Sequence, residues 1–277
     1  MAWPILEEEH VSTPPVPLSI ADLVDIPTRA RIRAVELVGG LGLGYLGQVF
    51  SSGEILTVLL GSFVRPGIDR FVLSPSHYVT AMYAVAAELG LLDERLLETY
   101  GIDGSDLETI GSERTPVVDF TCGSLAQGLS VGIGYALANR IAGSDARTVV
   151  FGSDGEMEEG QTWEAAMFAA HHGLGDLTLV LDCNDSQVDG PVSSVTTVEP
   201  IVDKWRAFGW HALEVDGHDL AAIRSALDSD AASPRVVIAR TTATAGLDTL
   251  AGLDDAHFIK IDAGLRGSLS DELAGRL

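Results

Sequence analysis

From residue 146 onward, short runs of β-branched and other apolar residues alternate with longer stretches of helical periodicity. The pattern predicts strands over 146–154, 177–182, 211–215 and 235–239, and helices over 159–173, 199–207 and 220–226. Strands that alternate with helices at this spacing are typical of an α/β fold with a parallel sheet.

The N-terminal third of the chain has a helical pattern and precedes the alternating strands and helices. The expected elements are a helix from Ser19 to Gly39-Gly40, a glycine-rich loop over 39–48, a helix opened by a Ser51-x-x-Glu54 capping box and ending at Leu60, and an apolar helix over 76–91. The first helix is expected to bury Leu23, Val24, Ile26, Ile32, Val35 and Leu37. Residues 1–18, rich in proline, are expected to form an extended arm, and residues 19–277 one domain.

Composition narrows the class of protein. The 277 residues are 46% hydrophobic, enough for a sizeable core. Asp and Glu number 40 against 17 Lys and Arg, for a formal net charge of −23, which disfavours nucleic acid and anionic membranes as partners. Cys122 and Cys183 are too few for a disulfide scaffold. Without a signal-peptide pattern or an apolar run of about 18 residues, a cytoplasmic location is expected.

Polar residues follow two of the predicted strands at the point where each ends. Asp154 lies at the carboxyl end of one strand, and Asn184 ends the next strand-like run thirty residues later. The carboxyl ends of parallel strands form one edge of a sheet, where ligands bind in open α/β folds. A carboxylate, an amide oxygen and a loop carbonyl are suitable ligands for Mg²⁺ when phosphate oxygens complete its shell. Gly155 would allow the backbone to approach an anion closely.

The stretch GSDGEMEEGQTWEAAMFAAHHGLGDLTLVLDCNDSQVDG, residues 152–190, resembles the thiamine-diphosphate motif of transketolases, a GDG followed about thirty residues later by Asn. Ser153 stands where the family has the first glycine. Two more segments resemble the family: RFVLSPSHYVTAMYAVAAELG (70–90), where Ser76 replaces a glycine before His77, and the glycine loop CGSLAQGLSVGIG (122–134). The DGHD at 216–219 matches a structural turn, in which His218 is interpreted as a polar cap. Together the matches run from about residue 30 to 260.

The resemblance implies a three-layer thiamine-diphosphate-binding fold, with helices on both faces of a parallel sheet, and a site that holds thiamine diphosphate and Mg²⁺. It assigns the metal to Asp154, Asn184 and the carbonyl of Ser186. It assigns the cofactor to His77, Gly123, Ser124, Leu125, Asp154, Gly155, Glu156 and Asn184, and catalytic roles to His77 and His257. For His257 a surface-loop histidine is the alternative. Glu159 matches an interface glutamate, with a plain salt-bridge residue as its alternative.

Three departures from the family pattern bear on the substrate. A family histidine is replaced by Tyr45, a second is lost where Gly111-Ser112-Glu113 stands, and a Lys-Gly-Lys-Gly stretch is replaced by the cation-free segment 242–246. Imidazoles bind sugar hydroxyls and move protons near neutral pH. Their loss therefore points to a different two-carbon donor or an unusual acceptor.

No segment resembles the family's pyrimidine domain, which supplies the glutamate that activates the cofactor. The resemblance therefore implies the N-terminal subunit of a split transketolase, active with a C-terminal partner subunit in an α2β2 assembly. The apolar helices at 51–60 and 76–91 and the helix after Asp154 would contribute to that interface or belong to the core. The expected reaction is transfer of a two-carbon ketol unit from a ketose. The alternatives are delivery of such a unit in secondary metabolism, to a carrier protein for example, and a degenerate subunit without catalysis.

Overall fold

The computed structural model describes residues 17–253 and 256–277, so most of the expected N-terminal arm lies outside the described residues. Six parallel strands form the central sheet in the order β3-β2-β4-β5-β7-β6. They are β2 (Arg70–Pro75), β3 (Phe120–Cys122), β4 (Thr148–Ser153), β5 (Leu177–Cys183), β6 (His211–Asp216) and β7 (Arg235–Arg240). The predicted parallel α/β architecture is confirmed.

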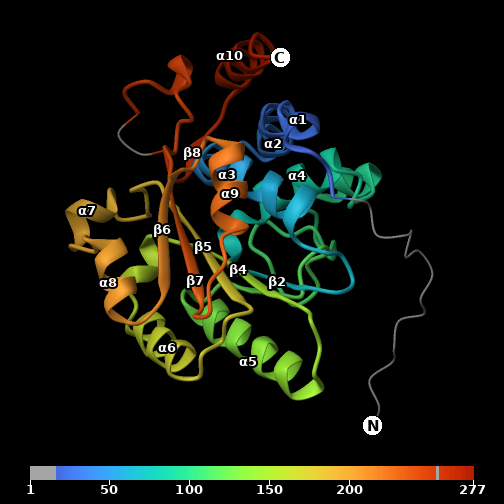
Figure 1. Ribbon diagram of the computed structural model, residues 1–277. Helices are drawn as coiled ribbons and strands as arrows, with labels where there is room; N and C mark the ends of the chain where they lie inside the picture. The colour runs from blue at the N-terminus through green and yellow to red at the C-terminus, as the bar shows by residue number, and fades with distance from the viewer. Residues whose placement is uncertain (1–16, 254–255) are drawn as a thin grey trace.

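Helices cover both faces of this sheet, so the three expected layers are present (Figure 1). Along β4, Val149 and Phe151 face one layer while Val150 faces the other, because side chains alternate along a strand. The first layer contains α2 (Ile26–Leu41), α3 (Leu46–Val58), α4 (Val79–Glu88), α9 (Leu220–Leu227) and α10 (Ala263–Ala274). The second contains α5 (Gln127–Ala142), α6 (Gly160–His171) and α8 (Ile201–Ala207).

The glycine-rich loop predicted over 39–48 is wrong. The helix α2 follows the short α1 (Ile20–Leu23) and continues past Gly39-Gly40 to Leu41, where Gly42 ends it at a φ of 81°. The two-residue strand β1 (Leu43–Gly44) then pairs with β8 (Ile259–Lys260) in a separate antiparallel sheet. Glycine lowers helix propensity, but packing against the first layer outweighs this local preference. Val24, expected inside, is 59% exposed, whereas Leu23 and Ile26 are buried.

The predicted capping box at Ser51 and Glu54 is also wrong, since α3 begins five residues earlier, at Leu46. Both side chains make long-range contacts instead. The Ser51 hydroxyl donates to Asp182 on β5, and Glu54 pairs with Arg31 of α2 at 2.5 Å. Helix α3 runs directly into the π-helical turn η1 (Leu59–Phe63).

The expectation that no apolar run reaches the length of a membrane span needs correction. Among the described residues, one helix, Leu46–Phe63, is long and apolar enough by length and composition, and 89% of it is buried inside the protein. It is the central helix of the first layer. Helix α4, which with the 3-10 turn η2 (Ser76–Tyr78) replaces the helix predicted over 76–91, is equally buried. Of the two interpretations offered for these helices, core packing is the one observed.

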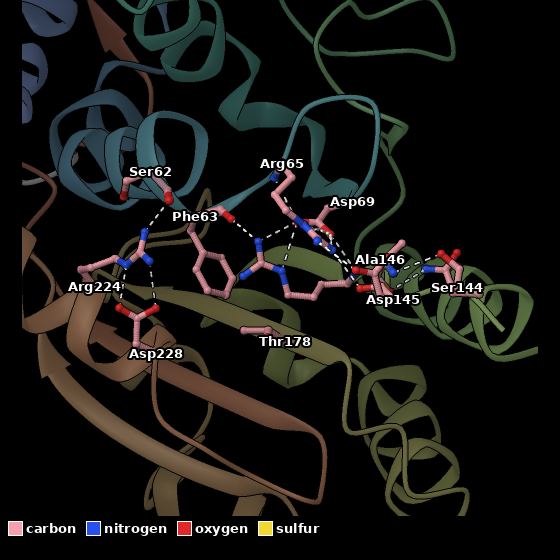
Figure 2. Close-up of polar contacts among 12 residues, drawn as sticks. Ser62, Phe63, Arg65, Asp69, Ser144, Asp145, Ala146, Thr178, Arg224 and Asp228 are labelled. Carbon is pink, nitrogen blue, oxygen red and sulfur yellow. Dashed lines mark hydrogen bonds and ion pairs between the residues drawn. The ribbon is translucent and has the colours of Figure 1, made fainter. Parts of the chain in front are cut away.

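An ion-pair cluster secures the amino-terminal edge of the sheet, opposite the site (Figure 2). The Asp69 side chain, fully buried between η1 and β2, pairs with Arg65 at 2.8 Å and with Arg147, just before β4, at 2.7 Å. The Arg147 guanidinium lies 4.2 Å from the centre of the Phe63 ring, and the Arg224 guanidinium lies 5.6 Å from it. These contacts fasten the end of the first-layer helix to the sheet.

Candidate functional site

Asp154 and Asn184 lie side by side at the carboxyl-terminal edge of the sheet, as predicted. Strands β4 and β5 are neighbours in parallel register, with Ser153 opposite Asp182. Asp154 is buried, and its carboxylate accepts hydrogen bonds from the backbone N–H of Gly155 at 2.9 Å and of Asp185 at 2.8 Å. The loop after β5 is therefore fastened to the residue after β4.

The Asn184 amide is held in one orientation. Its Nδ2 donates to the Ser51 hydroxyl at 3.0 Å and to Asp182 Oδ2 at 3.1 Å. Its Oδ1 therefore faces the other way, where the Ser186 N–H donates to it at 2.9 Å. The Asp154 carboxylate and the Asn184 amide oxygen thus contact successive backbone N–H groups, those of Asp185 and Ser186. Both oxygens belong to the donor set predicted for a metal, which remains a prediction.

Asp182 is a component of the site that the sequence analysis did not single out. It is completely buried and accepts hydrogen bonds from Ser51 at 2.5 Å, from the Tyr78 hydroxyl at 2.9 Å and from Thr241. These donors come from α3, η2 and the end of β7, so one carboxylate joins three separate elements behind Asn184. The Asp-x-Asn spacing at the end of β5 was the available signal, because a polar residue in a buried strand requires partners.

Glu156 faces away from the loop after β5. Its carboxylate accepts hydrogen bonds from the Ser74 hydroxyl at 2.5 Å and from the Ala126 N–H at 2.7 Å, and so fixes the loop before α5. Of the predicted loop residues, Gly123 and Ser124 are exposed, whereas Leu125 lines a cavity. The Glu156 side chain therefore positions the loop, and a contact with the cofactor remains a prediction.

A cavity of about 180 Å³ gathers several predicted site residues from distant parts of the chain. Its walls include His77, Leu125, Gly155, Ser186 and His257. The remaining lining residues are Tyr45, Gln48, Pro75, Tyr78, Ser153, Gln187 and Val188. His257 thus lines the cavity, although it lies in a loop and is partly exposed, and its role remains a prediction.

Tyr45 occupies the centre of an aromatic group in this cavity. Its ring meets the rings of His77 at 5.1 Å, His257 at 5.6 Å and Phe258 at 4.9 Å, all edge to face. The antiparallel β1–β8 pair brings these segments together. Gly47 permits the approach, because a Cβ atom there would lie 2.0 Å from the Ala256 carbonyl oxygen.

Burial governs the electrostatics of this edge. Burial and the nearby charge of Asp182 raise the pKa of Asp154 to about 7, although two backbone N–H groups oppose the shift. Burial likewise raises the pKa of Glu156 to about 7 and raises the pKa of Asp182. In the described chain, every hydrogen bond that these three carboxylates accept comes from a hydroxyl or an amide. A divalent cation at Asp154 would supply the missing positive charge.

Burial also lowers the pKa of His77 and raises the pKa of the Tyr45 phenol, which keeps both groups neutral near pH 7. In the part of the chain that the structure describes, no cluster of three His, Cys, Asp or Glu side chains could hold a metal. The predicted magnesium ligands are not such a cluster, because they are one carboxylate, one amide oxygen and one main-chain carbonyl.

Two other predictions concern residues outside the cavity. His218, interpreted as a polar cap in a turn, accepts a hydrogen bond from the Thr242 N–H at Nε2, and its Nδ1 lies 3.1 Å from Glu54. The helix α9 that follows is capped by Asp219. Glu159 is exposed at the start of α6 and forms no ion pair with another described residue.

The structure places the three departures from the family pattern in different surroundings. Segment 242–246 lacks a cation of its own, but Arg276 of α10 donates to the carbonyls of Ala245 and Gly246. Ser112 forms a turn in which its N–H donates to Thr115, outside the cavity lining. Tyr45 alone among these departures lines the cavity.

Comparison with known proteins gives a consistent result. The family described as "Transketolase, thiamine diphosphate binding domain" matches residues 31–264. A transketolase family protein of Sinorhizobium fredii is 37% identical over 255 residues, which span 86% of this chain and 91% of that protein. A protein named 6-deoxy-6-sulfo-D-fructose transketolase subunit, from a Clostridium species, is 35% identical over 86% of this chain and 92% of its own length.

Solved structures agree on the fold. The crystal structure of transketolase from Campylobacter jejuni matches with a TM-score of 0.83 and 24% identity, over 93% of this chain and 43% of that one. The chain therefore spans less than half the length of that transketolase, whereas it covers nearly all of the shorter relatives.

Proposed function

Because the chain belongs to the transketolase family and corresponds to the N-terminal subunit of its split members, we propose that it binds thiamine diphosphate through Mg²⁺ and transfers a two-carbon ketol unit from a ketose donor to an acceptor. The observation that carries the proposal is that Asp154 and the Asn184 Oδ1 atom contact the backbone of Asp185 and Ser186, next to the cavity that Gly155 and Ser186 line.

The residues present fit the metal and the cofactor. Asp154, Asn184 and the Ser186 carbonyl would bind Mg²⁺, which prefers oxygen ligands and leaves positions for diphosphate oxygens. Thiamine diphosphate, when bound, supplies the chemistry that breaks and makes carbon–carbon bonds. The chain's own residues hold and enclose it: Gly155 admits the diphosphate, and His77 and His257 hold or accept protons on the substrate side.

A partner subunit completes the proposal. A C-terminal transketolase subunit with the pyrimidine domain would supply the activating glutamate, and the assembly would be α2β2. The support for a partner is that similar proteins are named as transketolase subunits.

The donor substrate distinguishes ordinary ketol transfer from the alternative functions expected from the sequence. Relatives are named for different sugars, 6-deoxy-6-sulfo-D-fructose in one and apulose 4-phosphate in another, a protein of Phocaeicola vulgatus that is 32% identical. In this chain Tyr45 occupies the cavity in place of a family histidine, which favours an unusual donor or acceptor, including a two-carbon unit used in secondary metabolism. The presence of Asp154 and Asn184 at adjacent strand ends supports catalysis over a degenerate subunit.

Calorimetry of cofactor binding tests the proposal. The complex of this chain with its partner subunit is titrated with thiamine diphosphate in the presence of Mg²⁺. We expect Asp154→Ala and Asn184→Ala each to weaken binding at least 100-fold, because each removes a metal ligand. Asp176→Ala, an exposed residue at the opposite end of β5, is the matched control and should bind as the wild type does. Unchanged affinity in the first two variants would contradict the metal site.

A further inference from the structure

Gln48, in the first turn of α3, presents an unsatisfied atom at the cavity. Its side chain is 99% buried and lines the cavity beside Tyr45 and His257. Its Nε2 atom lies 2.8 Å from Nδ1 of His257. Its Oε1 atom has no hydrogen-bond partner among the described residues. A buried acceptor without a partner is unfavourable, so this oxygen fits a ligand that donates to it.

The neighbouring polar groups do not share this property. Gln187 lines the same cavity, and its amide donates to Glu158 at 3.0 Å. The hydroxyls of Ser76 and Thr121 are also buried without a partner in the described chain, but neither lines the cavity. Gln48 thus combines a buried, unsatisfied acceptor with a place in the lining of the cavity.

The position of the Gln48 amide is set by its surroundings. The edge-to-face contacts of Tyr45 hold the His257 ring, and the His257 ring nitrogen fixes the Gln48 Nε2 atom. The close approach of Ala256 to Gly47 brings His257 to this point. The oxygen is therefore held in place before a ligand arrives, which reduces the entropy lost on binding.

The chemistry of the cavity indicates what this oxygen would bind. No Lys, Arg, Asp or Glu side chain is among the described residues that line it, and Leu125 and Val188 contribute apolar surface. An amide oxygen attracts an O–H group and repels a carboxylate. A methyl group in the same place would leave the oxygen unsatisfied.

We propose that Gln48 is a specificity-determining residue whose Oε1 accepts a hydrogen bond from a hydroxyl group on the two-carbon unit of the donor. The inference rests on the proposed function and extends it to a residue of this chain. A site with a buried group that must be paired rejects a substrate that lacks the matching hydroxyl. The chain should therefore select hydroxylated two-carbon units against otherwise identical units that end in a methyl group.

Hydroxypyruvate and pyruvate test this directly, since they differ by one hydroxyl group. The complex with the partner subunit, loaded with thiamine diphosphate and Mg²⁺, is assayed with each probe by release of carbon dioxide. We expect the wild type to favour hydroxypyruvate in kcat/KM by about 100-fold or more. Gln48→Met, which keeps the length of the side chain and removes the amide, should reduce this preference at least tenfold while the Kd for thiamine diphosphate stays within about twofold.

Gln187→Met is the matched control, because it makes the same change in the same cavity at an amide that is already paired. Its preference ratio should stay within about twofold of the wild type. An unchanged ratio in Gln48→Met, or a wild type that uses both probes equally, overturns the proposal. If the complex binds thiamine diphosphate but consumes neither probe, the Gln48 proposal is also overturned, whereas the proposal that the chain binds the cofactor still stands. Failure to bind thiamine diphosphate would instead refute the proposed function.

Discussion

Gly47 shows how a single small residue shapes the site. A Cβ atom at this position would lie 2.0 Å from the Ala256 carbonyl oxygen, closer than any van der Waals contact. The missing side chain lets the segment that carries His257 reach the first turn of α3. Gly134 of α5 is the opposite case, since a Cβ atom there would have no neighbour within 4 Å.

We expect Gly47→Ala to lower the free energy of unfolding by about 1–3 kcal/mol, because backbone must move to make room for the methyl group. Gly134→Ala, the same substitution in a helix with open space, should raise it by about 0.5–1 kcal/mol through the entropy of the unfolded chain. Urea denaturation of both variants measures the difference. Equal effects in the two variants would contradict the prediction, because they would mean that the backbone at Ala256 moves aside at little energetic cost.

Local sequence patterns did not predict the hydrogen-bond partners of individual polar residues. Ser51 and Glu54 have the spacing of a capping box, yet both lie inside α3 and bind partners on β5 and α2. The turn residue His218 likewise contacts Glu54, which lies 164 positions earlier in the chain. A polar side chain can satisfy its hydrogen bonds locally or across the fold, and the local sequence does not distinguish the two.

Among the elements, the connection between η1, β2 and β4 depends on Asp69. Burial alone would raise the pKa of this carboxyl, but hydrogen bonds from Arg65 and Arg147 more than reverse the effect and lower its pKa to about 2. A carboxyl whose pKa is lower in the folded state stabilises the fold at pH values above its unfolded pKa, near 3.8. That contribution is lost as pH falls towards 2.

We expect the wild type to lose about 2 kcal/mol of folding free energy from this group between pH 5 and pH 2, which follows from the size of the pKa shift. Asp69→Asn should be less stable at pH 7 and lack this part of the pH dependence. Asp145→Asn is the matched control, because Asp145 pairs with the same Arg65 at 3.3 Å but is exposed, and should cost less than about 1 kcal/mol. Denaturant unfolding at several pH values gives both results. Parallel pH curves for the wild type and Asp69→Asn would contradict the prediction.

The predicted strands and helices from residue 146 onward are confirmed, with boundaries that differ by a few residues. Here the sequence is informative because buried parallel strands require unbroken apolar runs. Strands β2 and β3 were not predicted. The three residues of β3 carry little periodicity, and pairing with β2 rather than local preference stabilises them as a strand.

At the scale of the whole molecule, helix α6 exposes apolar side chains that could contact the proposed partner subunit. Met167 and Phe168 are 53% and 44% exposed, although the helix packs its other face in the second layer. The helices α3 and α4 have no such surface, because their side chains are buried in the first layer. Of the three helices considered for the interface, α6 is the one with apolar surface available for the proposed partner.

We expect Phe168→Asp to weaken association with the partner subunit at least tenfold, because it places a charge in an apolar contact. Its Tm should stay close to that of the wild type, since the side chain is partly exposed in the isolated chain. Val24→Asp changes an exposed apolar residue on a different surface and should leave association unchanged. Analytical ultracentrifugation of the mixed subunits measures the affinity. Equal affinities for both variants would exclude α6 from the interface.

The sequence by itself determined the fold class and the family, and it placed the proposed metal ligands Asp154 and Asn184 at one edge of the sheet. It could do so because Asp154 and Asn184 follow strands that neighbour one another, and the carboxyl ends of parallel strands share one edge. The tertiary structure decided how Gln48 meets His257 across 209 positions of the chain, and how Asp182 joins three elements. These contacts depend on the β1–β8 pair and on the fit of Gly47 against Ala256, which no local pattern encodes.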